Sequence, residues 1–396
     1  MIRTLAQLEV EHRRVLVRVD FNVPLTPEQK VRDDTRIRAA LPTIQAISDR
    51  GGIPILLSHL GRPKGARSPA FSLRPVAEHL ESLVGKSVHF GQDCIGDPAR
   101  AAIEQARPGD IVLLENLRFH PEEEANDPTF AAMLAALGDA YVNDAFGAAH
   151  RAHASISAIT EHFVGRRAVG LLMERELAYL SKVFHNPPRP FVAIVGGAKV
   201  SDKIRVLESL LERADTVLIG GGMANTFLAA QGHGIGDSIF DERYLSHAKS
   251  LYQRYPTKLI LPTDAVLADE LSDTAPVTVL DLQQIPSETE LRILDIGPDT
   301  IATFQDAIST AALVLWNGPM GAFEFKQFRK GTIAIATAVA QATDRGATTI
   351  VGGGDSIAAI AMAGVSDRIT HVSTGGGATL EYLEGKPLPG IVALEE

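Results

Sequence analysis

The sequence predicts an α/β protein with two doubly wound, Rossmann-like parallel-sheet domains. Short apolar runs recur along the whole chain, and stretches with apolar residues at helical spacing separate them. The runs are nearly continuous in apolar character, as expected for parallel strands that helices cover on both faces. With 396 residues, the chain is too long for one ordinary core, so two domains of similar size are expected.

The predicted elements alternate in order along the chain. In the first half, the expected strands are residues 15–19, 53–57, 111–114 and 140–142. In the second half they are residues 191–195, 216–219, 258–261, 313–316, 349–351 and 371–372. Amphipathic helices are expected at residues 128–137, 203–214 and 328–343. Residues 265–294 alternate more and hold turn residues, which indicates an antiparallel addition to the second sheet.

A helix followed by a proline-rich stop marks the expected domain boundary. Leucines at helical spacing begin at Leu171, and the stretch His185–Pro190 contains three prolines that end the helix. We therefore expect a first domain at residues 1–170, a helical and proline-rich connector at 171–188, and a second domain that begins at residue 189.

Composition excludes several classes of function. Hydrophobic residues make up 45% and charged residues 22%, and the formal net charge is −10, which disfavours non-specific binding to nucleic acid or anionic membranes. The amino-terminal residues resemble neither a signal nor a transit peptide, and no apolar run approaches membrane-spanning length, so we expect a cytoplasmic protein. Cys94 is the only cysteine, which excludes an intrachain disulfide, and we expect it to be a small buried apolar residue.

Charged and hydrogen-bonding groups follow every predicted strand of the first half. In open α/β sheets, ligands bind beyond the carboxyl ends of the strands. The candidates are Arg18, Asp20, Asn22, His59, Arg62, Arg118, Asn143, Asp144, His150, Arg151 and His153, with Arg36 after the first strand. Arginine pairs bidentately with phosphate or carboxylate, so their repetition predicts a pocket for a small polyanion. The alternative for Arg36 is a surface ion pair with Asp33 or Asp34.

Glycine runs follow the strands of the second half: Gly196–Gly197, Gly220–Gly222, Gly352–Gly354 and Gly375–Gly377. Such runs let backbone N–H groups approach phosphates at a helix N-terminus, so they predict a nucleotide site. Lys199 and Lys203 lie four residues apart and are expected on one face of the same first helical turn. Asp355 is a candidate magnesium ligand.

The remaining motifs do not indicate a different chemistry. No glycine run fits the dinucleotide fingerprint, no zinc-ligand spacing occurs, and Gly85-Lys86-Ser87 lacks the rest of a P-loop and is expected to end a helix. Two alternatives remain: a nicotinamide-dependent dehydrogenase, which shares the fold class, and a non-catalytic anion-binding protein.

Taken together, the motifs resemble those of the phosphoglycerate kinase family and occur in the family's order along essentially the whole chain. They are Arg18–Pro24, Ser58–Pro63, Glu115–Phe119, Asn143–Ser155, Gly196–Ile204, Gly220–Phe227, Trp316–Glu324, Gly352–Ser356 and Ser373–Ala378. The resemblance implies the glycolytic, reversible phosphoryl transfer between 1,3-bisphosphoglycerate and MgADP, which gives 3-phosphoglycerate and MgATP.

The resemblance also implies roles for individual residues. The acid is implied to bind in the first domain at Asp20, Phe21, Asn22, Arg36, His59, Leu60, Gly61, Arg62, Arg118 and Arg151. The nucleotide is implied to bind in the second domain at Lys199, Lys203, Asn317, Glu324, Gly352, Gly353, Gly354, Asp355 and Ser356, with Glu324 at the ribose. Catalytic roles are implied for Arg36, Lys199, Gly353 and Gly376, and Asp355 for Mg²⁺.

The same resemblance implies the arrangement of the molecule. A monomer is expected, with two domains facing a central cleft that closes about a hinge. The second domain would end at residue 374, and residues 375–396 would return to the first domain. The expected partners are small molecules only, namely ATP or ADP and the two phosphoglycerates, with no nucleic acid and no membrane.

Overall fold

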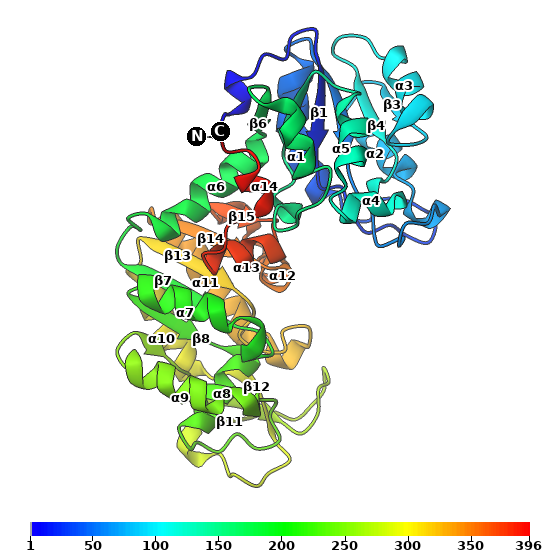
Figure 1. Ribbon diagram of the computed structural model, residues 1–396. Coiled ribbons are helices and arrows are strands. Elements are labelled where there is room, and N and C mark those ends of the chain that lie inside the picture. The colour runs from blue at the N-terminus through cyan, green and yellow to red at the C-terminus, as the bar shows by residue number, and fades with distance from the viewer. Residues whose placement is uncertain (1) are drawn as a thin grey trace. The chain divides into compact units, whose positions relative to one another are not determined.

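The chain divides into two compact units in the computed structural model, which describes residues 2–396 (Figure 1). The first unit comprises residues 2–178 together with Pro387–Glu396, and the second comprises Tyr179–Lys386. The division falls inside helix α6 (Leu171–Phe184), which lies within the connector expected at residues 171–188. Residues 375–386 also belong to the second unit, where α13 (Gly377–Leu383) packs against α7 (Ile204–Arg213).

The first unit contains a six-stranded parallel sheet with the order β3-β4-β2-β1-β5-β6. Its strands are β1 (Arg14–Arg18), β2 (Ile53–Leu57), β3 (Val88–Gly91), β4 (Ile111–Leu114), β5 (Ala140–Asn143) and β6 (Arg167–Val169). The four predicted strands match within a residue or so. The two that the pattern missed, β3 and β6, are the edges of the sheet. Both are short and only partly buried, so they lack a continuous apolar run.

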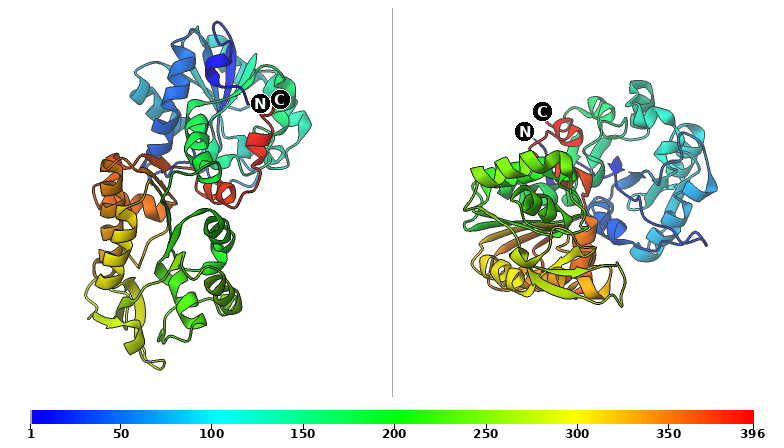
Figure 2. Two further views of the ribbon diagram at one scale, coloured as in Figure 1. Left: turned by 90° about the vertical axis from the view of Figure 1, so that its left-hand side faces the viewer. Right: turned by 90° about the horizontal axis from the view of Figure 1, so that it is seen from below.

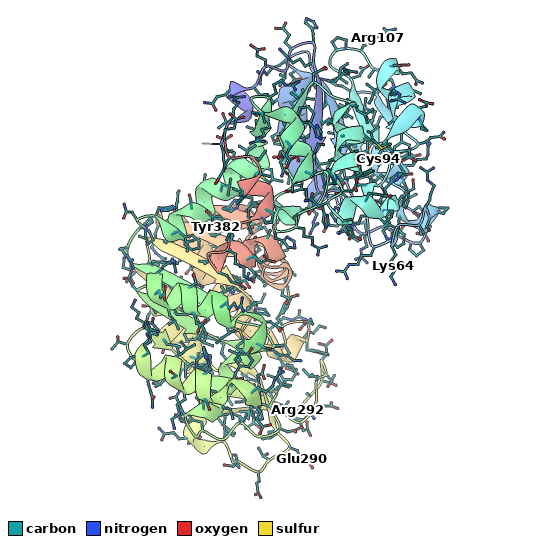
Figure 3. All side chains as sticks on the ribbon, viewed as in Figure 1. Lys64, Cys94, Arg107, Glu290, Arg292 and Tyr382 are labelled. Carbon is teal, nitrogen blue, oxygen red and sulfur yellow. The ribbon has the colours of Figure 1, made fainter. Side chains whose placement is uncertain are left out.

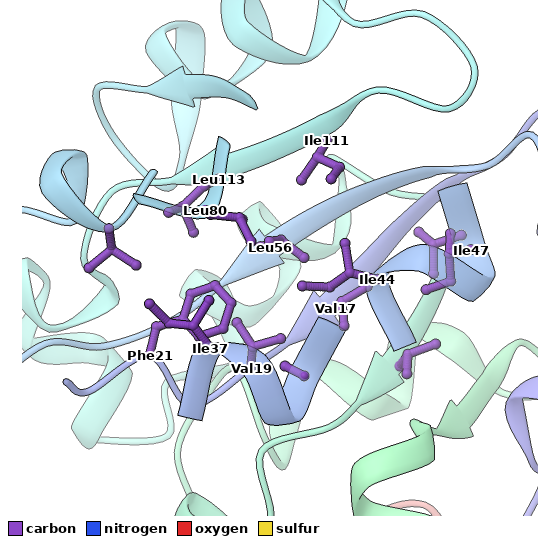
Figure 4. Packing of buried hydrophobic residues seen from close by; sticks show 14 of the residues in the cluster. Val17, Val19, Phe21, Ile37, Ile44, Ile47, Leu56, Leu80, Ile111 and Leu113 are labelled. Atoms are coloured by element: carbon purple, nitrogen blue, oxygen red, sulfur yellow. The ribbon is translucent and has the colours of Figure 1, made fainter. Parts of the chain in front are cut away.

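Helices cover this sheet and form the core of the first unit. They are α1 (Thr35–Ser48), α2 (Arg74–Val84), α3 (Gly96–Gln105), α4 (Pro121–Glu124), α5 (Pro128–Ala135) and α14 (Pro389–Val392). Ile37 and Ile44 of α1 and Leu80 of α2 pack on Val17 and Leu56 of the strands (Figure 4). Helix α2 ends where Gly85 adopts a left-handed φ of 65°, so the Gly85-Lys86-Ser87 stretch ends a helix as predicted.

The second unit contains another six-stranded parallel sheet, with the order β15-β14-β13-β7-β8-β9. Its strands are β7 (Phe191–Val195), β8 (Thr216–Ile219), β9 (Leu259–Ile260), β13 (Leu313–Asn317), β14 (Thr348–Gly352) and β15 (His371–Ser373). The further helices of this unit are α8 (Gly221–Ala230), α9 (Leu245–Arg254), α10 (Pro298–Ser309), α11 (Lys330–Asp344) and α12 (Gly354–Met362). All six strands were predicted, with ends that differ by a residue or two.

The antiparallel segment of the second unit forms a sheet of its own. Strands β10 (Asp264–Ala268), β11 (Thr278–Asp281) and β12 (Arg292–Ile296) pair in the order β11-β10-β12. The expectation that these strands extend the large sheet was therefore wrong. Strand β10 pairs with β11 on one side and β12 on the other, and among the described residues none of these three strands pairs with a strand of the parallel sheet.

The two ends of the described chain lie side by side in the first unit, as the views in Figure 2 agree. Ile2 forms an antiparallel bridge with Glu395, and Arg167 donates to the carbonyl of Glu395 at 2.7 Å. The Gly390 N–H also donates to the Ala149 carbonyl at 2.8 Å. The final ten residues are therefore part of the first unit's fold. Within residues 2–396, no helix has the length and apolar character needed to cross a membrane.

Candidate active site

Basic side chains gather at the carboxyl ends of the strands of the first sheet. His59 follows β2, and Arg118 lies in a 3₁₀ turn after β4. The carboxyl ends of these parallel strands lie at the same end of the sheet. Arg118 Nη1 donates to the carbonyl of Gly61 at 2.8 Å. Burial, followed by the positive charges of Arg18 and Arg118, holds the pKa of His59 well below its ordinary value. The fold thus brings together residues from separate strand ends, as the sequence predicts.

An ion pair holds Arg36 at this same end of the sheet. Its Nη1 lies 2.7 Å from Oδ2 of Asp20, which follows β1. Asp34 pairs instead with Arg38, at 2.9 Å, so the alternative of a surface pair between Arg36 and Asp33 or Asp34 is wrong. This pairing leaves Arg36 among the other candidate residues of the first unit.

Phe21 and Leu60 are buried, and their backbones are engaged. The side chains of Phe21 and Leu60 belong to the core. The backbone N–H of Phe21 donates to Ser58 Oγ at 2.9 Å, and that of Leu60 donates to Asn116 Oδ1 at 3.2 Å. These two residues therefore contribute shape and rigidity to the loops.

The remaining candidates of the first unit differ in how firmly they are held. Asn22 Oδ1 accepts from the Gly61 N–H at 2.9 Å, which ties together the loops after β1 and β2. Arg62 is exposed, and Arg151 is half-buried with its Nε 3.1 Å from His150 Nε2.

The sequence did not predict a buried cluster of polar side chains next to these basic residues. Arg18, Glu123 and Ser155 are fully buried and hydrogen-bonded to one another through Ser155, and His153 Nδ1 lies 3.8 Å from Glu123 Oε1. Burial is the largest cause that raises the pKa of Glu123 and lowers that of His153 to about 3. Arg18 and His153 stood among the strand-end residues without an assigned role. Glu123 had no local signal, because both neighbouring glutamates are exposed.

In the second unit, glycines at strand ends adopt conformations that other residues rarely reach. Gly353 precedes α12 with a φ of 92°, and Gly376 precedes α13 with a φ of 54°. Both lie at helix N-caps, where backbone N–H groups lack partners within the helix. The two turns can therefore offer N–H donors to an anion.

A cavity of about 790 Å³ opens beside these loops within the second unit. It is lined by glycines that follow β7 and β8, by apolar side chains and by a few polar residues, among them Asn225, Arg292, Glu324 and Asp355. Figure 3 labels Arg292, which comes from β12 and pairs with Asp237 at 2.6 Å. Mostly apolar walls with a few polar groups are typical of a site for a small molecule with an aromatic part.

Several predicted nucleotide residues connect the loops to one another. Lys203 Nζ donates to the carbonyls of Gly196 at 2.8 Å and Asn317 at 3.3 Å. Asn317 Nδ2 donates to the Gly352 carbonyl at 3.0 Å, and Ser356 Oγ accepts from the Gly318 N–H at 2.6 Å. Burial lowers the pKa of Lys203 to about 8, and Asp355 partly opposes this.

Lys199 and Lys203 do not share a helical turn, so this expectation was wrong. Lys199 is extended and exposed, and a 3₁₀ turn at Val200–Asp202 separates it from Lys203, which caps α7. The tight glycine loop before Lys199 delays the start of the α-helix. The helical pattern of the sequence does not indicate this delay.

Cys94 is buried, as expected, inside the first unit (Figure 3). Its thiol lies within 4.8 Å of ligand-type atoms of Asp93 and His120, a grouping that sequence spacing did not predict. Asp93 is already engaged: Oδ1 accepts from His120 at 2.7 Å, and Oδ2 lies 3.3 Å from Arg67. The guanidinium of Arg67 compensates the carboxylate and would repel a cation, so an ion-pair cluster explains this grouping.

Comparison with known proteins identifies the family. A family profile described as phosphoglycerate kinase matches residues 5–386. The chain belongs to the phosphoglycerate kinase family. The phosphoglycerate kinases of Chlorobaculum tepidum and Moorella thermoacetica are 54% and 53% identical to it, each across at least 99% of both chains.

Solved structures agree with this assignment. The phosphoglycerate kinase of Coxiella burnetii superposes with a TM-score of 0.90 at 40% identity, covering 100% of this chain and 99% of that one. That of Pyrococcus horikoshii gives 0.85 at 32% identity, covering 100% and 98%. As a member of the phosphoglycerate kinase family, the chain is a glycolytic phosphotransferase with a carboxyl acceptor, acting on small molecules. None of these relatives supports the dehydrogenase or the anion-binding alternative.

Proposed function

We propose that the first unit holds the phosphoglycerate and the second holds the nucleotide during phosphoryl transfer between 1,3-bisphosphoglycerate and ADP. This division rests on the contrast between the residues at the carboxyl ends of the strands in the two sheets. Arg36, His59 and Arg118 gather in the first unit, whereas glycine turns beside an apolar-walled cavity lie in the second. A small polyanion suits the former, and a nucleotide suits the latter.

Within the first unit, Arg62, Arg118 and Arg151 hold the acid with Asn22 and His59, while Arg36 approaches the transferred group. In the second unit, Lys199 and the N–H groups near Gly353 and Gly376 contact the phosphates, and Glu324 binds the ribose. Lys203, Asn317 and Ser356 fix the loops through the hydrogen bonds described above. Because donor and acceptor bind to separate units, closure about a hinge brings them together before transfer.

The chemistry requires charge compensation rather than a general base. The acceptor is a carboxylate that is already ionised at neutral pH, so no proton has to be removed from it. Arginine, lysine and backbone N–H groups align the reactants and compensate negative charge on the moving phosphoryl group. Exclusion of water on closure prevents hydrolysis from competing with transfer.

Asp355 fits the role of the magnesium-binding residue. Its carboxylate is exposed to the cavity in the first turn of α12, next to the turn at Gly353. Mg²⁺ in nucleotide sites is usually bound by one or two carboxylates together with phosphate oxygens and water. When bound, Mg²⁺ would neutralise phosphate charge there.

The experiment that tests this function is a coupled assay of ATP consumption with 3-phosphoglycerate, at limiting and saturating Mg²⁺. Turnover that depends on both substrates and on Mg²⁺ is expected. Consumption of ATP that is independent of 3-phosphoglycerate would contradict the proposal. Titration with NADH, monitored by fluorescence, should show no binding.

We further propose that the enzyme is a cytoplasmic monomer without nucleic-acid or membrane partners. The net charge of −10 supports the absence of nucleic-acid and anionic-membrane partners, because an acidic surface repels polyanions. Sedimentation equilibrium of the full chain would test the monomer, with a single species near 42.4 kDa as the expected result.

A further inference from the structure

A line of buried polar side chains ends at His59. Glu123, Ser155 and Arg18 are 0% exposed and His59 is 7% exposed. Ser155 Oγ lies 2.6 Å from Glu123 Oε1 and 2.8 Å from Arg18 Nε, and Arg18 Nη2 lies 3.2 Å from His59 Nδ1. Glu123 lies in α4, Ser155 in the loop after β5, Arg18 at the end of β1 and His59 in the loop after β2.

Two hydrogen-bond directions in this line follow from the chemistry of arginine, which has donors only: Arg18 donates to Ser155 Oγ and to His59 Nδ1. The Ser155 hydroxyl in turn donates to Glu123 Oε1. Glu123 Oε2 accepts from the backbone N–H of Ser155 at 2.9 Å. Both carboxylate oxygens thus act as acceptors, which is the pattern of an ionised Glu123 that compensates the buried guanidinium.

The donor-only chemistry of Arg18 also determines the state of the His59 ring. Its Nδ1 faces an arginine N–H and must be an unprotonated acceptor. A neutral ring with an acceptor at Nδ1 carries its hydrogen on Nε2. Burial and the nearby charges of Arg18, Arg118 and Arg36 oppose a second proton on the ring and hold the pKa of His59 well below its ordinary value.

We propose that Arg18, Ser155 and Glu123 are positioning residues that hold His59 as a neutral Nε2–H donor toward the phosphoglycerate. This rests on the proposed function, in which His59 contacts the acid. The opposite tautomer would present a lone pair to an anionic substrate, which is repulsive. Arg18 can enforce the ring state because its Nη1 also donates to the Val19 carbonyl, so three contacts fix the plane of the guanidinium.

The first test uses the unmodified protein. Long-range ¹H–¹⁵N correlation spectra of the histidine rings report which nitrogen carries hydrogen, and the His59 signals are assigned by their absence from His59→Gln. We expect His59 to be neutral at pH 7 with its hydrogen on Nε2, both with and without 3-phosphoglycerate. A ring with hydrogen on Nδ1, or a doubly protonated ring, would overturn the proposal without any need for variants.

The second test interrupts the line at two points. Ser155→Ala removes the link between Arg18 and Glu123, and Glu123→Gln places an amide NH₂ against one of the two Ser155 donors, which in the wild type donate to separate carboxylate oxygens. Both are expected to give a mixture of His59 tautomers and to raise the KM for 3-phosphoglycerate about tenfold, the effect of one lost charge-assisted hydrogen bond. The KM for MgATP should not change.

Tyr141→Phe is the matched control. It removes a buried hydrogen bond from the Tyr141 hydroxyl to the Ser155 carbonyl, 2.7 Å long, but leaves the line intact. If Ser155→Ala and Glu123→Gln match this control in both the ring spectrum and the KM, the positioning role is wrong. Should a variant fail to fold, the spectrum of the wild-type ring still decides the proposal.

His59→Gln distinguishes failure of the proposed function from failure of the positioning role. An unchanged KM for 3-phosphoglycerate in His59→Gln would show that His59 does not contact the acid, whatever its tautomer. A raised KM in His59→Gln, together with hydrogen on Nδ1 in the wild-type ring, would support the contact and reject the role of Arg18, Ser155 and Glu123.

Discussion

The guanidinium of Arg36 lies 2.7 Å from the carboxylate of Asp20, and this pair joins the first turn of α1 to the loop after β1. Asp20 is the more buried partner, with a side chain 11% exposed against 36% for Arg36. A partly exposed arginine held from one side retains N–H groups for a ligand on the other. The pair therefore presents Arg36 to the proposed phosphoglycerate site.

Arg36→Ala should lower kcat by about 10³-fold or more, with a modest change in the KM for 3-phosphoglycerate. An arginine that contacts the moving phosphoryl group lowers the barrier without tightening ground-state binding, and such arginines contribute about 10³–10⁵ in rate in nucleotide-hydrolysing proteins. Arg36→Lys should restore little, because an ammonium lacks the planar fork.

Arg38→Ala is the control for Arg36, because Arg38 lies in the same helix and makes only an exposed pair with Asp34. Such pairs contribute about 0–1 kcal/mol to stability, and kcat should stay near wild type. Steady-state kinetics of the three variants decide the matter. A near-normal kcat in Arg36→Ala would leave Arg36 with the structural role alone.

Asp355→Asn should weaken binding of the magnesium–nucleotide complex while leaving the Tm close to wild type. The carboxylate is exposed in the cavity, so its loss removes the proposed metal ligand and no packing. The measurement is the KM for ATP across a Mg²⁺ titration, with Asp367→Asn, an exposed acid elsewhere in the second unit, as the control. A lowered Tm with an unchanged Mg²⁺ requirement would make Asp355 a structural residue.

The first unit should bind 3-phosphoglycerate without nucleotide. Its basic residues are held by contacts within that unit, such as Arg118 with the Gly61 carbonyl, so the second unit's ligand is not needed to form the pocket. Calorimetry on the full chain should detect binding in the absence of ADP, and Arg62→Ala should weaken it. If heat of binding appears only once ADP is present, the two sites are not independent.

Asp144→Asn should make stability less dependent on pH. Burial raises the pKa of Asp144 from 3.8 to about 6, so its ionisation in the folded state costs about 3 kcal/mol. Because the folded pKa lies above the unfolded one, the contribution to stability is fully present below about pH 4 and is lost as the pH rises through about 6. Denaturant unfolding at pH 4 to 8 measures the difference between the variant and wild type.

Asparagine can keep the helix cap that Asp144 makes, because a single oxygen carries that cap. Oδ1 accepts from the N–H groups of Leu172 at 2.9 Å and Met173 at 3.2 Å, at the start of α6. In Asp295, each oxygen accepts from a different N–H group, so Asp295→Asn should lose one bond and destabilise the fold. Equal destabilisation by both substitutions at pH 8 would contradict this account of Asp144.

Local patterns predicted most of the framework. The central strands of both sheets were visible because continuous apolar runs, such as residues 53–57 and 191–195, report burial on two faces. The edge strands β3 and β6 were not, because both are short and only partly buried and have no such run. The glycine turns at Gly353 and Gly376 were predicted because the conformation each needs is a property of the residue itself.

The sequence by itself determined the fold class, the strand ends that carry charge and the strand ends that carry glycine. Only the tertiary structure decided which polar groups meet. Glu123 lies between two exposed glutamates, and nothing local distinguishes it; it is buried because Ser155 and Arg18 converge on it. Arg18 and Ser155 are 137 residues apart, so their contact depends on how the sheet is assembled. Local propensity is encoded within a few residues, whereas the partner of a buried charge is set by long-range packing.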